Sequence, residues 1–189
     1  LGNNLETALS LPVAGLHVDL VRAPEQLEPV VDAASKGQVI SLGVIDGRNI
    51  WRADLQAIHD RIAPVVARRG AEWFELAPSC SLLHVPIDLE QESDLDPDLK
   101  SWLAFSVQKI EELKLLARAL GEGIASVAPE FLAASKALAK RRESAKVHNL
   151  DVISRAAGLT REMAQRKAPF ATRRALQQSN LNLPPFPTT

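Results

Sequence analysis

The segment 38–54 constrains the fold more than any other stretch of this chain. It opens with an apolar, β-branched run, Val39–Ile45, which is typical of a strand covered on both faces, as in a parallel sheet. An Asp-Gly pair then marks a turn, and Asp54 is placed to cap a helix. A buried strand followed by a polar loop and a helix forms a (βα) unit. Such units display side chains at the carboxyl edge of the sheet, where α/β proteins bind their ligands.

The same strand and helix pattern occurs on both sides of this segment. Strands are predicted over 16–21 and 73–76, and helices over 24–36 and 55–69 separate the three strands. This order and spacing predict βαβ crossovers and a parallel sheet. Three parallel strands leave two open edges, which a complete domain rarely tolerates. We therefore expect an α/β fold whose sheet is incomplete.

Beyond the third strand the sequence becomes helical. The clearest predicted helix covers 99–120, with Trp102, Ile110, Leu113 and Leu116 near helical period. Further helices are expected over 2–11, 129–145, 150–158 and, broken at Pro169, over 160–179. We expect three parts: the (βα) units over 1–90, an all-helical segment over 91–180, and an extended, proline-rich linker over 181–189.

Composition excludes several classes of protein. A formal charge of −1 gives no electrostatic basis for binding nucleic acid or an anionic membrane. No stretch approaches the ~20 apolar residues of a membrane span, and the first residues do not resemble a signal peptide. The single cysteine, Cys80, cannot form an internal disulfide and fits a reducing compartment, so we expect a cytoplasmic protein. Because the numbering begins at Leu1 and the only methionine is Met163, we expect an excised piece of a longer chain.

Few residues suggest chemistry by their spacing. A Cys/His/Asp metal cluster could be imagined from His17, Asp19, Cys80 and His84, but the spacing is not diagnostic. Cys80 follows a predicted strand, where a thiol could be reactive, although a small buried hydrophobe is the commoner case.

Three groups of charged residues allow structural or functional interpretations. Arg48 and Arg52 could clamp an anion, or they could pair with carboxylates at neighbouring strand ends, namely Asp19, Asp46 or Glu75. Glu111 lies three residues before Lys114, which allows a weak ion pair. The basic run Lys140, Arg141 and Arg142 is typical of a solvated helix end.

Four runs resemble a single family when they are taken together and in order. They are LPVAGLHVDLV (11–21), SLGVIDGRNIWRADL (41–55), LAPSCSLLHVPIDLE (76–90) and LDPDLKSWLAFSVQKIEEL (95–113). They resemble the cobalamin-independent methionine synthases, and the resemblance covers nearly the whole chain. It implies the C-terminal half of the amino-terminal barrel of a protein made of two (βα)8 barrels. The chain would then be a partial TIM barrel.

The resemblance also implies what the longer protein does. Members of the family transfer the methyl group of methyltetrahydrofolate polyglutamate to homocysteine, whose thiolate is bound to zinc. The expected partners of this chain are the missing strands of its own barrel and the catalytic C-terminal barrel of the same polypeptide. No catalytic, cofactor-binding or metal residue can be carried over to these 189 positions. We expect a scaffold that supports the cleft between the barrels and is inactive alone.

One comparison within that family concerns Asp19 and Cys80. The segment APSCSLL resembles the part of the catalytic barrel that carries a cysteine ligand of zinc, which puts Cys80 at that position. The segment LHVDLV resembles the strand that carries a glutamate ligand, which puts Asp19 at or near it. We interpret the pair as a vestigial remnant of duplication, because zinc needs three or four protein ligands. The alternative to the whole family interpretation is a non-enzymatic α/β interaction module with a helical tail.

Overall fold

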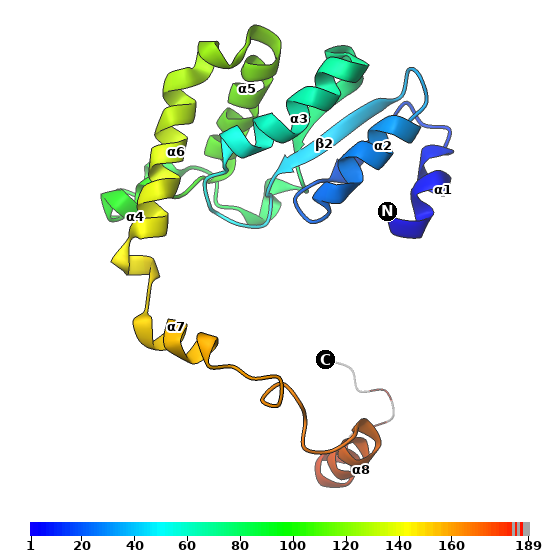
Figure 1. Ribbon diagram of the computed structural model, residues 1–189, viewed down its shortest axis with the longest axis vertical. Helices are drawn as coiled ribbons and strands as arrows, with labels where there is room; N and C mark the ends of the chain where they lie inside the picture. Colours follow the sequence, from blue (N-terminus) through cyan, green and yellow to red (C-terminus); the bar gives the residue numbers. More distant parts are fainter. Residues whose placement is uncertain (183, 185, 187–189) are drawn as a thin grey trace. The chain divides into compact units, whose positions relative to one another are not determined.

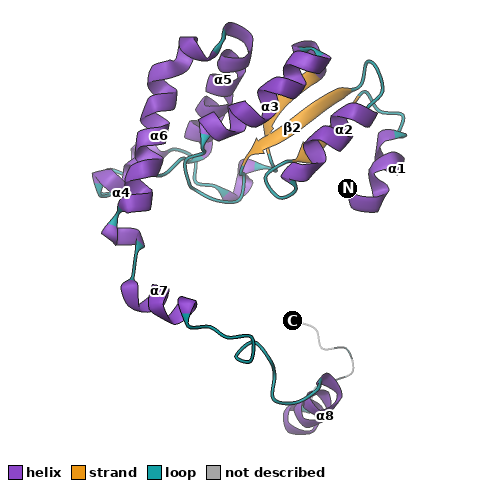
Figure 2. Cartoon of the chain, in the orientation of Figure 1, coloured by secondary structure: helices purple, strands orange, loops and turns teal. Residues whose placement is uncertain are grey.

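The computed structural model describes residues 1–182, 184 and 186, which divide into two compact units, Leu1–Ser144 and Ala145–Thr189. The main elements of the first unit are shown in Figures 1 and 2, and their bounds follow in chain order. They are α1 (Leu5–Leu9), β1 (Gly15–Asp19), α2 (Leu27–Ala33), β2 (Val39–Ile45), α3 (Leu55–Arg69), β3 (Phe74–Pro78), α4 (Pro97–Ser101), α5 (Ser106–Glu122) and α6 (Ala128–Glu143).

The three predicted strands form one parallel sheet in the order β1-β2-β3. The predicted bounds of β2 and α3 agree with the structure, and β1 ends two residues earlier than predicted. Asp54 caps α3 as predicted, since its carboxylate accepts a hydrogen bond of 3.1 Å from the backbone N–H of Ala57. The α/β class and the parallel sheet are therefore confirmed.

One hydrophobic core joins most helices of the first unit to one face of the sheet, whereas α4 packs in a separate, smaller cluster. Val18, Leu42 and Leu76 stand side by side in register on this face. Helices α2, α3, α5 and α6 pack over it, and the side chains that join them include Val30, Ile62 and Leu116, all fully buried. In Figure 2 the helices α2 and α3 lie on the same side of β2.

The opposite face of the sheet is polar. Alternation along the strands places His17, Ser41 and Glu75 there, again in register with one another. His17 and Glu75 are exposed and Ser41 is half-buried. The prediction that β2 is covered on both faces holds only toward its carboxyl end, where Gly43 and Ile45 are buried.

The predicted continuous helix over 99–120 is wrong. The chain forms α4 and α5 instead, and residues 102–105 between them are all buried. The backbone of this interruption bonds to the segment after β2: Arg52 donates to the carbonyl of Trp102, and Ala104 donates to the carbonyl of Ile50. These backbone groups cannot also make helical hydrogen bonds, so the long-range contact overrides the helical pattern.

The second unit contains two α-helices among its described residues, α7 (Leu150–Ala157) and α8 (Phe170–Leu181). They agree with the helix expected over 150–158 and with the helix expected after Pro169. The helix expected between residue 160 and Pro169 is wrong, because that stretch forms turns and irregular structure. The predicted linker over 181–189 falls largely outside the described residues. The division after residue 90 stays a prediction for the longer protein; within the chain, contacts place the boundary of the compact units after Ser144.

No helix in the described part of the chain is long and apolar enough to cross a membrane.

The open edges of the sheet lead to a prediction about the isolated chain. Among the described residues, β1 and β3 each pair with β2 alone, so each leaves backbone donors and acceptors on its outer side. We expect the 189-residue chain to self-associate through these edges, or to bind the rest of its polypeptide. Sedimentation velocity at micromolar concentrations checks this. A monodisperse, cooperatively folding monomer would contradict it.

Candidate functional site

The three strands end at one edge of the sheet, where most of the candidate residues lie. Asp19 is the last residue of β1, Asp46 follows β2, and Cys80 lies two residues after β3. Backbone hydrogen bonds extend the pairing to this edge, from Leu20 to Gly43 (3.0 Å) and from Ser79 to Ile45 (2.7 Å). The sequence correctly predicted that these residues share the carboxyl edge, because parallel strands must end on the same side.

The two aspartates at this edge shape the turns that follow their strands. One oxygen of Asp19 accepts from the backbone N–H groups of Val21 and Arg22, both at 3.0 Å. One oxygen of Asp46 accepts from the backbone N–H of Arg48 (2.7 Å), and the other accepts from the Asn49 side-chain amide (2.7 Å). Both carboxylates thus hold their own turns, as Asp does in Asx turns.

Cys80 is half-buried against the turn that follows β2. A Cβ on Gly47 would lie 2.6 Å from the carbonyl oxygen of Cys80 and 3.0 Å from its Sγ. The hydroxyl of Ser79 also accepts a hydrogen bond from the backbone N–H of Gly47 (3.2 Å). The two turns can approach this closely only because residue 47 has no side chain.

His17 links all three strand regions on the open face. Its Nε2 lies 3.2 Å from the carbonyl oxygen of Ser79, and its Nδ1 lies 3.0 Å from the hydroxyl of Ser41. A carbonyl oxygen only accepts, so Nε2 carries the hydrogen, and Nδ1 of the neutral ring accepts from Ser41. The imidazole reaches across Gly43, where a Cβ would lie 2.9 Å from its Cε1.

The imagined metal cluster is not assembled. Residues 1–182, 184 and 186 contain no group of three or more His, Cys, Asp or Glu side chains that could hold a metal ion. Both ring nitrogens of His17 have protein partners. Asp19 and Cys80 share the strand-end edge, as the remnant hypothesis requires, but their descent from a zinc site stays a prediction.

The segment 46–54 is tied by its backbone to the residues between α4 and α5. Arg52 donates to Trp102 at 2.9 Å, Ala104 donates to Ile50 at 2.8 Å, and Trp51 forms an isolated antiparallel bridge with Leu103. This short ladder fixes the polar loop that the sequence singled out.

Helix α5 supplies two buried charged residues beneath the same loop. Lys109 is only 1% exposed, and its ammonium donates to the Asn49 side-chain oxygen (3.4 Å) and the Trp51 carbonyl (3.2 Å). Glu112 is 7% exposed and accepts from the backbone N–H of Ala53 at 2.9 Å. Burial lowers the pKa of Lys109, against the opposing effects of Glu112 and Asp46.

Burial also raises the pKa of Glu112. The hydrogen bond from Ala53 and the positive charges of Lys109 and Arg52 act in the opposite direction. Its second carboxylate oxygen is buried and has no hydrogen-bond partner. A carboxylate with one unpaired oxygen out of water is costly, which is why burial outweighs the favourable contacts.

Basic residues at the end of α6 contact the same loop. The guanidinium of Arg141 lies 3.6 Å from the centre of the Trp51 ring, a cation–π contact. Arg142 lies 3.6 Å from a carboxylate oxygen of Asp54, and Lys140 pairs with Asp98 of α4. The expectation of a solvated helix end holds for Lys140 and Arg142, which are exposed and also pair with carboxylates, whereas Arg141 is half-buried against Trp51.

The two arginines of the loop do not behave as expected. Arg48 is exposed, whereas Arg52 is half-buried beside Glu112. Among the described residues, neither guanidinium forms an ion pair with Asp19, Asp46 or Glu75. The predicted weak pair of Glu111 and Lys114 is confirmed at 2.8 Å.

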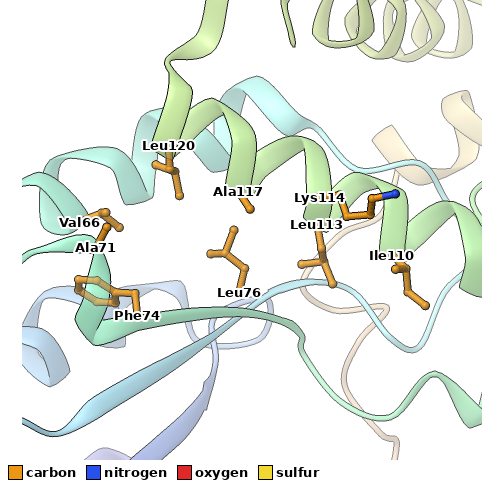
Figure 3. A pocket seen from close by; sticks show the side chains of 10 residues that line it. Val66, Ala71, Phe74, Leu76, Ile110, Leu113, Lys114, Ala117 and Leu120 are labelled. Atoms are coloured by element: carbon orange, nitrogen blue, oxygen red, sulfur yellow. The ribbon is translucent and has the colours of Figure 1, made fainter. Parts of the chain in front are cut away.

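Two of the hollows that border these elements differ in the chemistry of their lining. One, of about 300 Å³, lies under the loop and includes Asp46, Asn49, Arg61 and Lys109 in its lining. The other, of about 380 Å³, is the apolar groove of Figure 3, where Ile110, Leu113 and Leu120 of α5 face Phe74 and Leu76 of β3. Apart from Lys114, which pairs with Glu111, the groove is lined by apolar residues and glycine, so we place the candidate site at the strand ends.

Known proteins match this chain along its whole length. Residues 1–70 match the family described as cobalamin-independent synthase, N-terminal domain. A protein of Rhodopseudomonas palustris is 59% identical over all 189 residues, and one of Caulobacter vibrioides is 55% identical over 188 residues. Both are named 5-methyltetrahydropteroyltriglutamate–homocysteine methyltransferase.

Over its whole length the chain is thus similar to proteins of the cobalamin-independent methionine synthase family. It spans about a quarter of these relatives, 24% of the length of each, so it matches one segment of each relative. The resemblance inferred from the four sequence runs is confirmed, and the match to the amino-terminal domain agrees with the part of the protein that was expected.

Sequence reasoning missed Lys109 and Glu112. The helical period predicts that Ile110 lies on the buried face of α5, but Ile110 is 49% exposed. The buried face contains Lys109, Glu112 and Leu116. The signal that could have found them is their spacing. Two opposite charges three residues apart lie in line with Leu116 and Ala119, so the buried stripe contains a charged pair.

The role of Lys109 can be tested by removing its charge. Lys109→Met would leave the Trp51 carbonyl and the Asn49 oxygen without this donor, and it would remove one of the two cations next to Glu112. We expect a loss of about 2–4 kcal/mol in the free energy of unfolding. The matched control is Lys114→Met on the same helix, whose exposed pair with Glu111 should contribute less than about 1 kcal/mol. Urea denaturation measures both, and equal losses would contradict the assignment.

A second test addresses the crowding at Gly43. A Cβ there would lie 2.8 Å from the carbonyl oxygen of Val18 and 2.9 Å from both Ser79 Cα and His17 Cε1. We expect Gly43→Ala to destabilise the fold by about 1–3 kcal/mol. Gly121→Ala is the control, since nothing lies within 4 Å of its new Cβ, and it should be neutral or stabilising. The idea fails if both variants unfold at the same urea concentration.

Glu112 leads to a prediction of pH dependence. Because its pKa is raised in the folded state, the folded chain binds more protons than the unfolded chain over the window from about 4.3, the ordinary glutamate value, up to the raised value. This contribution to stability is therefore lost as the pH rises through that window. We expect Glu112→Gln to remove this part of the pH dependence, as measured by unfolding free energies at a series of pH values. Parallel curves for the two proteins would rule it out.

Proposed function

We propose that the longer protein containing this chain transfers the methyl group of 5-methyltetrahydropteroyltriglutamate to homocysteine. The observation that carries this proposal is the 59% identity over all 189 residues to proteins named for that reaction. Identity of this kind along a whole segment supports a shared role for the segment. The chain contributes a scaffold to that role, and the reacting groups are supplied by other parts of the polypeptide.

We further propose that this scaffold is part of a (βα)8 barrel. The helices cover one face of a parallel sheet in which the strand order follows the chain order. In a doubly wound sheet the helices cover both faces, whereas in a barrel the second face turns inward. The polar second face of this sheet and its two open edges support a barrel completed by other strands.

The loop 46–54 would then help shape the cleft between this barrel and the catalytic one. Its anchoring by Lys109, Glu112 and Arg141 keeps its backbone in one position at the carboxyl edge, where barrel proteins bind their ligands. Arg48 is exposed on this loop and is available to a group outside the described residues.

The residues of this chain do not fit the zinc ion of the family. The Asp19 carboxylate accepts hydrogen bonds from the backbone of its own turn. In the described part of the chain, no third ligand joins Asp19 and Cys80. We propose that zinc is held by other parts of the polypeptide. The expected partners remain the missing barrel strands, the catalytic barrel, the folate polyglutamate and homocysteine, in a cytoplasmic protein.

An interaction module without enzymatic activity is the second candidate. The exposed apolar residues of α7, Leu150, Val152 and Ile153, are the observation that favours it, because such a face is typical of a docking helix. The similarity to methyltransferases outweighs it, since the 189 matched positions include this helix.

Methyl transfer tests the proposed function directly. The full-length protein is given 5-methyltetrahydropteroyltriglutamate labelled in its methyl group, together with homocysteine and without cobalamin. We expect the label to appear in methionine, and to be absent when homocysteine is omitted. A folded full-length protein that transfers no label would overturn the proposal.

The isolated chain provides a further prediction. We expect the purified 189 residues alone to form no methionine in the same assay, because the scaffold holds no reacting group. Adding the remainder of the polypeptide as a separate fragment should restore some transfer if the two parts associate. Turnover by the chain alone would refute the scaffold assignment.

A further inference from the structure

A row of polar residues crosses the open face of the sheet. His17, Ser41 and Glu75 are direct neighbours in the register of β1, β2 and β3. They line a hollow of about 400 Å³, together with residues near the start of β1 and β2. The first layer of this face is thus an open polar surface and not the apolar layer that usually fills a barrel.

The hydrogen-bond donors in this row are already used. His17 Nε2–H donates to the Ser79 carbonyl, and the Ser41 hydroxyl donates to His17 Nδ1. The Glu75 carboxylate, when ionised, only accepts, and within the described residues this side chain forms no hydrogen bond or ion pair. The row therefore offers lone pairs and one negative charge, but no free donor, to whatever covers it.

We propose that the polypeptide covering this face places a guanidinium or ammonium group against Glu75. The inference rests on the proposed barrel, in which this face turns inward. Burying an unpaired carboxylate is strongly unfavourable, and a cationic donor is the group that matches both the charge and the lack of donors. The chain covers 24% of its relatives' length, so the remaining polypeptide is long enough to supply the covering segment.

Carboxyl labelling of the full-length protein tests whether Glu75 is covered. A water-soluble carbodiimide with a small amine modifies accessible carboxylates, and mass spectrometry locates them. Glu72 is the internal reference, because it is exposed and lies three residues before Glu75. We expect Glu75 to escape labelling in the native protein while Glu72 is labelled, and both to be labelled after unfolding.

Charge variants of the same protein test what covers it. We expect Glu75→Lys to lower the melting temperature by at least about 3 °C, and Glu75→Gln to lower it by less. The matched variants Glu72→Lys and Glu72→Gln should change it by less than about 1 °C, because that side chain stays in water.

The outcomes separate this inference from the proposed function. Protection of Glu75 together with the ordered losses in melting temperature supports the cationic partner. Protection with no loss in Glu75→Gln and Glu75→Lys overturns the partner and leaves the barrel intact. Labelling of Glu75 as fast as Glu72 overturns both the cationic partner and the inward orientation of this sheet face. The proposed methyl transfer is tested independently by the activity assay.

Discussion

The buried ammonium of Lys109 is the interaction on which the candidate site depends. It lies beneath the loop 46–54 and donates hydrogen bonds to the Asn49 side-chain oxygen and to the Trp51 backbone carbonyl. Without it, these partly buried oxygens would lack this donor. Glu112, one turn further along α5, satisfies a backbone N–H of the same loop. Burying a charge costs free energy. The hydrogen bonds that hold the loop in place must therefore offset the cost of removing Lys109 and Glu112 from water.

The sheet is built asymmetrically, and this asymmetry explains much of the sequence. On the helix face the in-register residues are Val18, Leu42 and Leu76, whereas on the other face they are His17, Ser41 and Glu75. An isolated three-stranded sheet gains little from a polar layer. The layer makes physical sense as one wall of an enclosure whose other walls belong to a longer polypeptide, which agrees with relatives about four times as long.

Glycine at two positions allows the carboxyl edge to form. Gly47 lets the turn after β2 touch the turn after β3, and Gly43 leaves room for the imidazole of His17. Together they bring the ends of the three strands close enough for side chains on different strands to bond. The site is therefore defined as much by absent side chains as by the polar groups around it.

The sequence by itself determined the parallel sheet, the bounds of β2 and α3, the cap at Asp54 and the shared edge of Asp19, Asp46 and Cys80. These follow from local periodicity, from capping and from the rule that parallel strands end together, and none requires knowledge of distant contacts. The family was recognisable for a related reason, because its short motifs are contiguous in the chain.

Only the tertiary structure decided how the loop after β2 is held. The break between α4 and α5 arises because residues 102–105 form backbone hydrogen bonds with a segment some 50 positions earlier. The helical period of the sequence does not reveal such a distant partner. In the folded chain Lys109 is buried and Ile110 is half exposed, and the basic end of α6 contacts an aromatic ring and carboxylates. Pairings between distant residues depend on which surfaces the folded chain brings together, and the order of residues along one helix cannot specify them.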